Sequence, residues 1–354
     1  MSARARRVAV VGSGSWGTAV AGLAAANCPE VVMWCRSVEV ARRVADEHRN
    51  PRHLVDYRLP ENVAATGSLA EALDGADAVV LALPSAHLRA TCARMAGLLA
   101  DDVPVLVLTK GVEEGTGDLM LDVCAQELGR PGRMAVLSGP NHAEEVCLAK
   151  VSAAVVASSD EGVASTFRDV LCGPAFRVYV TSDVRGVEVC AATKNVIAIA
   201  CGVAVGMGAG DNTLAVLMTR GLAEVSRIAA AVGADPLTPM GLAGMGDLVA
   251  TCTSPHSRNR SFGEALVAGE TLEGYEARTG MVVEGARAAR SVRELAVRAG
   301  VDAPIARAVD DVLHHGATLQ EASERLLGRI PSQEFYGIPD PTHKKEPNAC
   351  TTRP

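Results

Sequence analysis

Residues 7–18 read RVAVVGSGSWGT, a short apolar run that leads directly into a glycine-rich turn. The run predicts a buried strand, and the apolar spacing that resumes after the turn predicts a helix. In such a unit Gly12 allows the tight turn, Gly14 admits a pyrophosphate to the backbone, and Gly17 lets helix and strand pack closely. The helix N-terminus favours negative charge, so we expect a dinucleotide here. An ordinary glycine-rich turn is the alternative.

The rest of the first half alternates short apolar runs with longer helical patterns. Strands are predicted at Arg7–Val11, Val31–Cys35, Val63–Thr66, Ala78–Leu83, Val103–Leu108, Met134–Ser138, Ala153–Ala157 and Phe176–Val180. Helices are predicted between them, for example at Thr18–Asn27, Leu88–Leu99 and Gly162–Leu171. Several strands are apolar on both faces, as parallel strands covered by helices are. The alternation predicts a doubly wound α/β sheet.

The pattern changes near residue 184, and beyond it we expect helices alone. They are predicted at Val187–Val205, Leu214–Val232, Ser261–Ala268, Val283–Ala299, Ile305–His314 and Leu319–Leu327. The fold class is therefore α/β, with an N-terminal Rossmann-like doubly wound sheet followed by an all-helical C-terminal domain. We place the dinucleotide-binding domain at residues 1–183 and the helical substrate and catalytic domain at 184–330. We expect the proline-rich residues 331–354 to form a disordered tail.

The composition narrows both the class of function and the compartment. Of the 354 residues 48% are hydrophobic, enough for a large core, and the net charge of −7 argues against nonspecific nucleic-acid binding. The ten cysteines form no C-x-x-C pair and lie in apolar runs, which indicates free thiols in a reducing, cytoplasmic compartment. No apolar run reaches the ~18 residues of a spanning helix, so we expect no membrane insertion.

The end of the second predicted strand bears on which dinucleotide is bound. Sites that prefer NAD usually place an acidic residue there to hold the ribose 2′-hydroxyl, whereas this chain has Cys35, Arg36 and Ser37. Arg36 can pair with a 2′-phosphate, so we expect NADP(H) to be preferred or to be used alongside NAD(H). A solvated arginine at a strand end is the alternative.

Lysine is rare in this chain, since only five of the 34 basic residues are lysines. Lys194 lies inside an otherwise apolar helical pattern, and Lys110 follows a predicted strand at the sheet edge where ligands bind. A desolvated ammonium group can give up its proton, whereas a guanidinium cannot. We therefore expect both lysines in the active site. The alternative is that their side chains reach out to solvent.

A second polar cluster follows in the helical half. Asp247 lies in a glycine-rich, apolar neighbourhood, where it can orient the Lys194 ammonium or accept a hydrogen bond from a substrate hydroxyl. Arg258 beside Asn259 pairs a forked donor with an amide, which suits a phosphate group. The alternatives are a helix N-cap for Asp247 and a solvated loop for Arg258. Glu284 starts a predicted helix, where an acid can also simply complement the helix dipole.

A series of short motifs extends, in characteristic order and spacing, from residue 10 to about residue 328. The motifs are Val10–Ala19, Thr109–Gly111, Leu137–Pro140, Thr193–Ala198, Thr219–Glu224, Gly244–Leu248, Ser257–Asn259 and Val283–Gly285. With them the chain resembles the NAD(P)-dependent glycerol-3-phosphate dehydrogenases of the bacterial type. The resemblance implies reversible hydride transfer between NAD(P)H and dihydroxyacetone phosphate to give sn-glycerol 3-phosphate, which feeds glycerophospholipid synthesis. It also implies a homodimer.

The resemblance further implies roles for individual residues. Lys194 becomes the catalytic proton donor and acceptor, and no metal is expected. The implied substrate contacts are Lys110, Gly139, Asn141, Lys194, Asn195, Asp247, Thr251, Ser257, Arg258 and Asn259. The implied cofactor contacts are Gly12, Gly14, Ser15, Trp16, Gly17, Arg36, His53, Lys110, Ala143, Arg258, Val282 and Glu284.

Three stretches depart from the pattern of that family. After the Ser-Gly-Pro motif the family usually has Ser or Thr and then Phe, where this chain has Asn141 and His142. The Asn141 amide can still donate a hydrogen bond. His53 begins a stretch that commonly reads Tyr-Leu-Pro-Gly, which leaves its role open. Ser37 stands where a second basic residue often follows, which weakens the case for a 2′-phosphate.

Two other functions stay open at this point. A β-hydroxyacid, ketopantoate or 6-phosphogluconate type dehydrogenase would share the architecture and use a lysine, although the phosphate cluster argues against unphosphorylated substrates. A non-catalytic NAD(P)-binding protein would need neither Lys194 inside a helix nor Asp247 opposite it.

Overall fold

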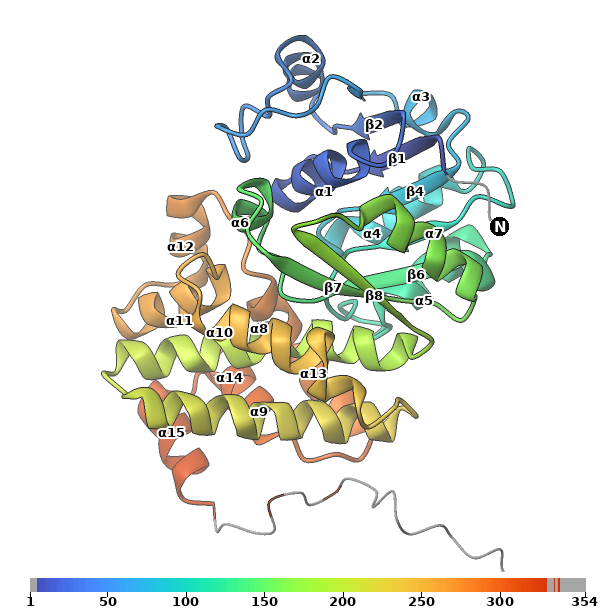
Figure 1. Cartoon of the computed structure of the whole chain (residues 1–354). Coiled ribbons are helices and arrows are strands. Elements are labelled where there is room, and N and C mark those ends of the chain that lie inside the picture. Colours follow the sequence, from blue (N-terminus) through green and yellow to red (C-terminus); the bar gives the residue numbers. More distant parts are fainter. Residues whose placement is uncertain (1–4, 330–333, 335–336, 338–354) are drawn as a thin grey trace, which may run out of the picture.

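The computed structural model describes residues 5–329, 334 and 337, and its first half is built around one β-sheet (Figure 1). The strands are β1 (Arg7–Val11), β2 (Glu30–Trp34), β3 (Val63–Thr66), β4 (Ala78–Leu81), β5 (Val105–Val107), β6 (Met134–Ser138), β7 (Ser152–Ala157) and β8 (Phe176–Thr181). Their order across the sheet is β3-β2-β1-β4-β5-β6-β7-β8. All the predicted strands are confirmed, with small shifts at some ends.

The position of β1 in the sheet decides where a ligand binds. β1 pairs in parallel with β2 on one side and with β4 on the other, so the order of strands reverses at this point. In open α/β sheets ligands bind in the crevice outside the carboxyl ends of such strands. The glycine-rich turn begins at Gly12, directly after β1, and therefore lies at that crevice.

One strand pair departs from the parallel arrangement that the apolar strands suggest. β7 runs antiparallel to β6, and β8 is parallel to β7. A parallel partner for β6 would need a connection that returns along the whole strand, usually through a helix that packs on the sheet. The connection instead contains only the five-residue helix α6 (Ala143–Cys147), so β7 starts near the end where β6 finishes.

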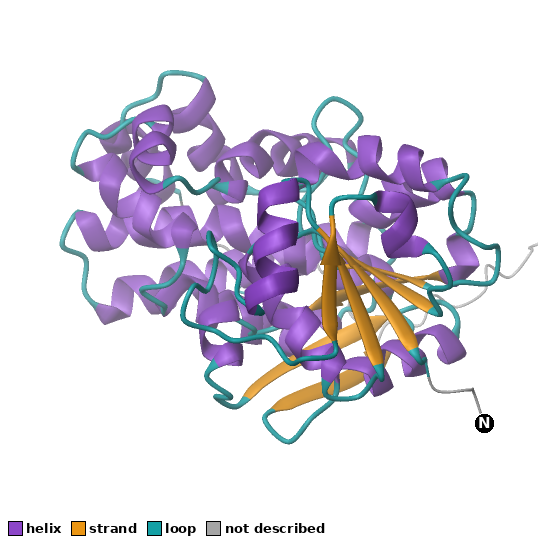
Figure 2. Cartoon of the chain, turned by 90° about the horizontal axis from the view of Figure 1, so that it is seen from above, coloured by secondary structure: helices purple, strands orange, loops and turns teal. Residues whose placement is uncertain are grey.

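Helices cover both faces of the sheet, as the view along the fanned strands shows (Figure 2). Besides α6 they are α1 (Ser15–Ala25), α2 (Val38–Glu47), α3 (Leu69–Leu73), α4 (Ser85–Met95), α5 (Met120–Leu128), α7 (Glu161–Leu171) and the short turn η1 (Pro131–Arg133). α1 begins at Ser15 rather than at the predicted Thr18, because the helix opens directly from the glycine-rich turn. One face of the sheet encloses an apolar core that includes Val8, Val10 and Phe167.

Residues 184–329 contain helices and connecting loops and no strand, as expected. The helices are α8 (Val184–Gly206), α9 (Asp211–Ala231), α10 (Asp247–Thr253), α11 (Arg258–Val267), α12 (Leu272–Thr279), α13 (Glu284–Arg298), α14 (Pro304–His314) and α15 (Leu319–Leu327), with the short turns η2 (Thr238–Met240) and η3 (Leu242–Gly246). A second apolar core joins this half to the other face of the sheet, and includes Leu81, Val136 and Ile199. The two halves therefore share a core, which fixes how they pack against each other.

α8 lies at the centre of the helical half and packs against α9, α10, α11 and α13. By length and composition alone α8 could cross a membrane, but 72% of its most apolar window is buried inside the protein. It is thus a core helix, and Lys194 lies near its middle. The nine described cysteines form no disulfide with one another. The expected tail, 331–354, lies outside the described residues apart from Glu334 and Gly337.

Candidate active site

The side chain of Lys194 is buried between α8 and α10. Its ammonium group donates to the carboxylate of Asp247 and, at 2.9 Å, to the Thr251 hydroxyl. Thr251 in turn donates to the backbone carbonyl of Asp247 at 2.6 Å. Asp247 and Thr251 both belong to α10, so one short helix holds the lysine. The structure thereby brings together three residues that the sequence analysis placed in the site.

The carboxylate of Asp247 also accepts hydrogen bonds from the sheet half. Lys110, which follows β5, donates to Asp247 Oδ2 at 2.8 Å, and Ser138 at the end of β6 donates to the same oxygen at 3.0 Å. Asp247 is only 3% exposed. It is not the N-cap of α10, because Gly246 holds that position. The carboxylate instead gathers two ammonium groups and a hydroxyl from both halves of the protein.

Burial and these contacts change the acid–base properties of the cluster. Burial lowers the pKa of Lys194 to about 7, although the charge of Asp247 acts to raise it. Burial alone would raise the pKa of Asp247, but the ammonium groups of Lys110 and Lys194 hold it well below its ordinary value. At neutral pH the carboxylate is therefore charged, while Lys194 can either hold or release a proton. A general acid for chemistry near neutral pH needs this property.

The glycine-rich turn has the geometry that a pyrophosphate site requires. A Cβ atom on Gly12 would lie 2.3 Å from the Ala82 carbonyl oxygen, and one on Gly17 would lie 2.2 Å from the Gly12 oxygen. Nothing lies within 4 Å of a Cβ built on Gly14, so the backbone there is open to a ligand. Gly14 is also the N-cap of α1 and provides no side-chain cap. The first N–H groups of the helix are therefore available to an anion.

Side chains around the turn support the same conclusion. Asn50 is fully buried and donates to the Ser13 carbonyl at 2.8 Å and to Thr18 Oγ1 at 2.9 Å, which ties the turn to the segment after α2. Ser15 and Trp16 open α1 and are partly exposed. The Trp16 Nε1 atom is buried without an acceptor among the described residues. An unpaired buried donor of this kind fits a group contributed by a ligand.

Arg36 lies exposed after the end of β2, where a contact to the ribose was predicted. Its Nη1 atom lies 3.2 Å from Nε2 of His87 in α4, which places the guanidinium over the crevice side of the sheet. Ser37 is the N-cap of α2, and its hydroxyl accepts from the Val40 N–H at 3.4 Å. Ser37 is uncharged and caps α2, so the Arg36 guanidinium is the charged group at this strand end that can contact a phosphate.

The predicted phosphate cluster lies at the N-terminus of α11. Ser257 is the N-cap of this helix, and its hydroxyl accepts from a backbone N–H of the first turn. Asn259 donates to Asn195 Oδ1 at 3.0 Å and accepts from the Gly285 N–H at 2.8 Å, so its amide joins α8 to α13. The Ser257 hydroxyl hydrogen and the second N–H of the Asn259 amide can still donate to a phosphate, as can the Arg258 guanidinium and the free backbone N–H groups of the first turn.

Arg258 lies among the predicted cofactor residues of three other segments. Its Nη1 donates to the Val282 carbonyl at 3.3 Å. Burial lowers the pKa of His53, and the charge of Arg258 lowers it further, which places His53 near the guanidinium. Burial raises the pKa of Glu284, whose carboxylate accepts from the Ser85 hydroxyl of α4 at 2.9 Å. These residues meet where the two halves of the protein face each other.

The loop after β6 supplies the remaining predicted residues. A Cβ atom on Gly139 would lie 2.6 Å from the Ala153 carbonyl oxygen, so the loop passes too close to β7 for any larger residue. The Asn141 Nδ2 atom is buried without an acceptor among the described residues. Ala143 is the first residue of α6 and is buried. The unpaired amide of Asn141 fits an acceptor on a ligand.

Comparison with known proteins gives the family. A profile for the N-terminus of NAD-dependent glycerol-3-phosphate dehydrogenase matches residues 7–164, and a profile for its C-terminus matches residues 183–324. The chain belongs to this family. The glycerol-3-phosphate dehydrogenase (NAD(P)+) of Nocardia farcinica is 48% identical over 330 residues, which cover 91% of this chain and 98% of that protein.

Solved structures agree with the family and with the fold. The crystal structure of glycerol-3-phosphate dehydrogenase from Coxiella burnetii matches with a TM-score of 0.87 at 36% identity, over 92% of this chain and 99% of that one. A ketopantoate reductase from Ralstonia eutropha JMP134 reaches a TM-score of 0.54 at 16% identity, over 91% and 99% of the two chains. The second likeness extends to the fold alone.

Three polar residues of this family member were not singled out from its sequence. Ser138 donates to Asp247, Ser85 donates to Glu284, and Asn50 fixes the glycine-rich turn. Ser138 and Ser85 stand at or just beyond the end of a predicted strand. That position is the signal that could have found them, because the carboxyl ends of parallel strands meet at the crevice.

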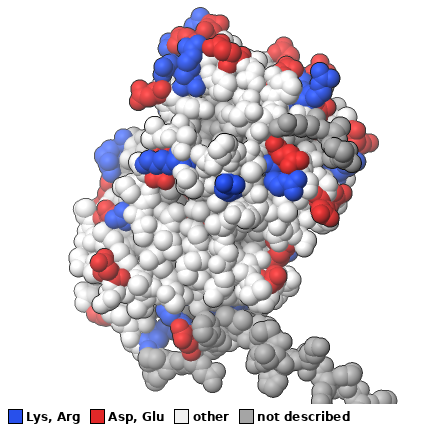
Figure 3. Space-filling view, in the orientation of Figure 1, with Lys and Arg blue, Asp and Glu red and all other residues white. Residues whose placement is uncertain are grey.

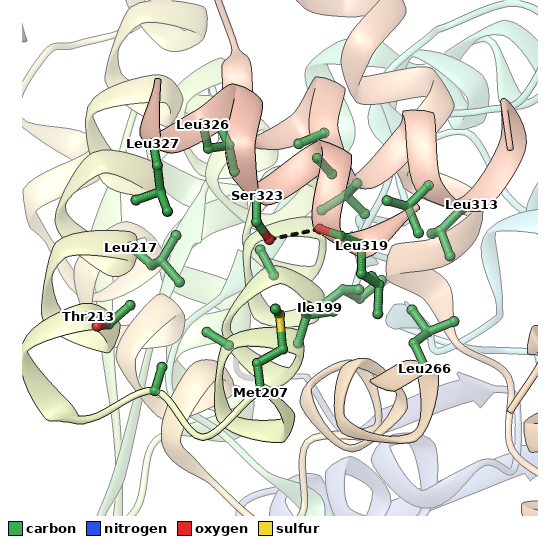
Figure 4. A pocket seen from close by; sticks show the side chains of 18 residues that line it. Ile199, Met207, Thr213, Leu217, Leu266, Leu313, Leu319, Ser323, Leu326 and Leu327 are labelled. Atoms are coloured by element: carbon green, nitrogen blue, oxygen red, sulfur yellow. Dashed lines mark hydrogen bonds between the residues drawn. The ribbon is translucent and has the colours of Figure 1, made fainter. Parts of the chain in front are cut away.

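The helical half of this dehydrogenase family member also contains an apolar cavity of about 280 Å³ (Figure 4). Side chains from α8, α9, α11, α14 and α15 line it, among them Ile199, Leu217 and Leu313. The hydroxyl of Ser323 donates to the Leu319 carbonyl at 2.8 Å and so is already paired. A phosphorylated, hydroxylated substrate needs placed polar groups. The polar cluster around Lys194, and not this cavity, is therefore the candidate active site.

Proposed function

We propose that this chain catalyses reversible hydride transfer between NAD(P)H and dihydroxyacetone phosphate, giving sn-glycerol 3-phosphate. The observation that carries the proposal is the buried cluster of Lys194, Lys110 and Asp247. The cluster joins the end of β5 to α8 and α10, while the glycine-rich turn suits a dinucleotide and the N-terminus of α11 suits a phosphate. The names of the relatives agree with this activity.

Lys194 is proposed as the proton donor in reduction and the acceptor in oxidation. A bound nicotinamide supplies or takes up the hydride. As negative charge grows on the carbonyl oxygen, the Lys194 ammonium stabilises it and transfers its proton. In a site without bulk water one placed donor of this kind contributes roughly 3 kcal/mol to the transition state. Asp247 and Thr251 hold the ammonium group, and Lys110 adds a second positive charge on the same side.

The phosphate is proposed to lie at the N-terminus of α11. Arg258 supplies a charged fork, and the backbone N–H groups of the first turn, near Ser257 and Asn259, supply further donors. These groups bind far from the reacting carbon. Their binding energy therefore fixes the orientation of the ketone relative to Lys194. We assign Gly139, Asn141 and Asn195 to the wall along which the carbon chain lies.

The cofactor is proposed to bind along the crevice after β1. The pyrophosphate fits the backbone N–H groups near Gly14, Ser15 and Trp16. Gly12 and Gly17 allow the close packing of the turn that brings these groups together. Arg36 fits a 2′-phosphate, which supports use of NADP(H) together with NAD(H), as the relatives' names indicate. Further contacts are assigned to the residues that surround the cleft, His53, Lys110, Ala143, Arg258, Val282 and Glu284.

Several wider properties belong to the same proposal. We assign residues 1–183 to cofactor binding and 184–330 to substrate binding and catalysis, with the product feeding glycerophospholipid synthesis in the cytoplasm. The lack of disulfides among the nine described cysteines supports a reducing compartment. We further propose a homodimer. Few charges lie over the front of the helical half (Figure 3), and Val216, Met245 and Val249 are exposed apolar residues of α9, η3 and α10.

The direct test is the initial rate of NADPH and of NADH oxidation with dihydroxyacetone phosphate. Unphosphorylated dihydroxyacetone and ketopantoate serve as control substrates. The proposal predicts turnover that depends on the phosphorylated ketone, with both cofactors and at least equal efficiency for NADPH. Faster turnover of ketopantoate would instead support a related dehydrogenase of the same architecture. Cofactor binding without any substrate-dependent turnover would support a non-catalytic protein.

A further inference from the structure

His142 lies beside the cluster that holds Lys194, but it belongs to a different element. It is the N-cap residue of α6, in the loop that follows β6, and its side chain is half-buried. Its Nε2 atom lies 3.2 Å from the backbone carbonyl of Ala250. Ala250 belongs to α10, between Asp247 and Thr251. The imidazole therefore joins the sheet half to the helix that positions the lysine.

The charges around the imidazole determine its protonation state. Lys194 of α8, Lys110 after β5 and Asp247 of α10 all act on it, and the ring of His256 lies 6.4 Å away between centroids, just before α11. Burial lowers the pKa of His142, and the two lysines lower it further. At neutral pH the ring is thus neutral with one N–H group. Because a backbone carbonyl can only accept, that hydrogen lies on Nε2.

We propose that His142 is a positioning residue for the hydride-transfer reaction, because its hydrogen bond pins α10 to the loop after β6 and so keeps Asp247 and Thr251 against Lys194. The inference rests on the proposed role of Lys194 as proton donor. It also gives a role to one of the positions at which this chain departs from the family's common Phe.

The bond to Ala250 complements the other contact between α10 and the end of β6. Ser138 holds the carboxylate of Asp247 from one side, at 3.0 Å. His142 holds the backbone of the same helix one residue before Thr251. If the second contact is lost, α10 can rotate or shift while its first residue stays tethered. Asp247 and Thr251 then no longer hold the Lys194 ammonium at a single position.

Loss of this bond has two consequences that can be measured. Misplacing a reacting group by about 1 Å costs up to roughly 100-fold in rate. In addition, Asp247 acts to raise the pKa of Lys194, whereas Lys110 acts to lower it. A looser contact to Asp247 therefore lowers the pKa of Lys194, and Cys252 and His142 are the other titratable groups near this lysine. The pH at which reduction loses half its rate should move down.

The test compares three variants of the full chain with the wild type. His142→Phe keeps the ring volume without a donor, His142→Asn has a donor that is too short to reach Ala250, and His142→Gln keeps a donor of suitable length. We expect kcat for reduction to fall about tenfold in the Phe and Asn variants, within the range for misplaced groups. KM for NADPH and the melting temperature should stay unchanged, and the falling limb of the pH profile should move to lower pH. The Gln variant should recover most of both losses.

Three results would overturn the inference. They are wild-type kinetics in His142→Phe, equal losses in the Gln and Phe variants, and a loss of rate explained by a lower melting temperature with no shift of the pH profile. Lys194→Ala, measured in parallel, distinguishes failure of the positioning role from failure of the proposed function. Retained turnover in Lys194→Ala overturns the proton-donor role of Lys194. If Lys194→Ala loses turnover but His142→Phe has wild-type kinetics, only the positioning role of His142 is overturned.

Discussion

Lys110 Nζ and Asp247 Oδ2 lie 2.8 Å apart, although Lys110 follows β5 in the sheet half and Asp247 begins α10 in the helical half. The other oxygen of the carboxylate accepts from Lys194. All three groups are buried or nearly so, and removing one member of a buried ion pair typically costs about 3–5 kcal/mol. Asp247 therefore links the contact between the two halves to the charge state of Lys194.

The pH dependence of turnover should report the charge on Lys194. Burial lowers its pKa to about 7, so the ammonium loses its proton as the pH rises through that value. kcat for ketone reduction should therefore fall over this range, while kcat for oxidation of the alcohol rises. Asp247→Asn removes a charge that raises the pKa of Lys194, so both midpoints should move to lower pH. Midpoints that stay fixed in this variant would contradict the coupling.

Arg258→Ala should weaken substrate binding. The guanidinium is the one charged side chain of the proposed phosphate cluster, and a charge-assisted bond of this type contributes about 1.5–3 kcal/mol. We expect KM for dihydroxyacetone phosphate to rise by at least about tenfold, which corresponds to 1.4 kcal/mol. Arg278→Ala is the matched control, because Arg278 is an exposed arginine of the same half that pairs with Glu270. A KM equal to that of the control would refute the phosphate role.

Arg36→Ala should change the balance between the two cofactors. The exposed guanidinium fits a 2′-phosphate, which only NADPH carries, so KM for NADPH should rise about tenfold while KM for NADH stays nearly constant. Arg42→Ala, on the exposed side of α2, controls for the loss of positive charge nearby. Equal changes for the two cofactors, or a strong preference of the wild type for NADH, would exclude this role.

Glu188 should make the stability of the protein depend on pH. Its Oε1 atom accepts from the Leu121 N–H at 2.8 Å, its Oε2 atom is buried without a partner among the described residues, and burial raises its pKa from 4.5 to about 7. The folded state thus keeps a proton that the unfolded state has already lost. The buried, protonated Glu188 therefore contributes its full stabilisation of the folded state below pH 4.5. This contribution to the free energy of unfolding is lost as the pH rises through about 7, and the total loss is up to about 3 kcal/mol.

Chemical denaturation at several pH values measures this effect. Glu188→Gln keeps the acceptor for Leu121 and removes the titration, so its free energy of unfolding should decline less than that of the wild type as the pH rises. Glu294→Gln, at an exposed position of α13, should behave as the wild type does. The same decline in Glu188→Gln as in the wild type would rule out Glu188 as the source.

Much of the fold could be predicted because its strands are easily recognised in the sequence. Strands buried on both faces appear as continuous apolar runs, and all of them were found. The pair of Lys194 and Asp247 was predictable for a related reason, since each is a charge in an apolar context that requires a partner. The direction of β7 was not predictable, because apolar character does not distinguish parallel from antiparallel pairing.

The finer structure of the site depends on tertiary contacts that no local pattern encodes. α10 and α12 were not predicted, because short helices are held by packing more than by their own propensity. The sequence predicted phosphate contacts for Ser257 and Asn259, which stay predictions, but it did not show that Ser257 also caps α11 or that Asn259 also joins α8 to α13. These structural contacts depend on the folded arrangement.

The central claim is most directly tested by the rate of dihydroxyacetone phosphate reduction in Lys194→Ala and in Lys150→Ala. Lys150 is a largely exposed lysine outside the cluster and serves as the matched control. Loss of the proton donor should lower kcat by at least about 100-fold, with NADPH binding retained, while the control keeps wild-type turnover. Turnover in Lys194→Ala within a few-fold of that in Lys150→Ala would contradict the account.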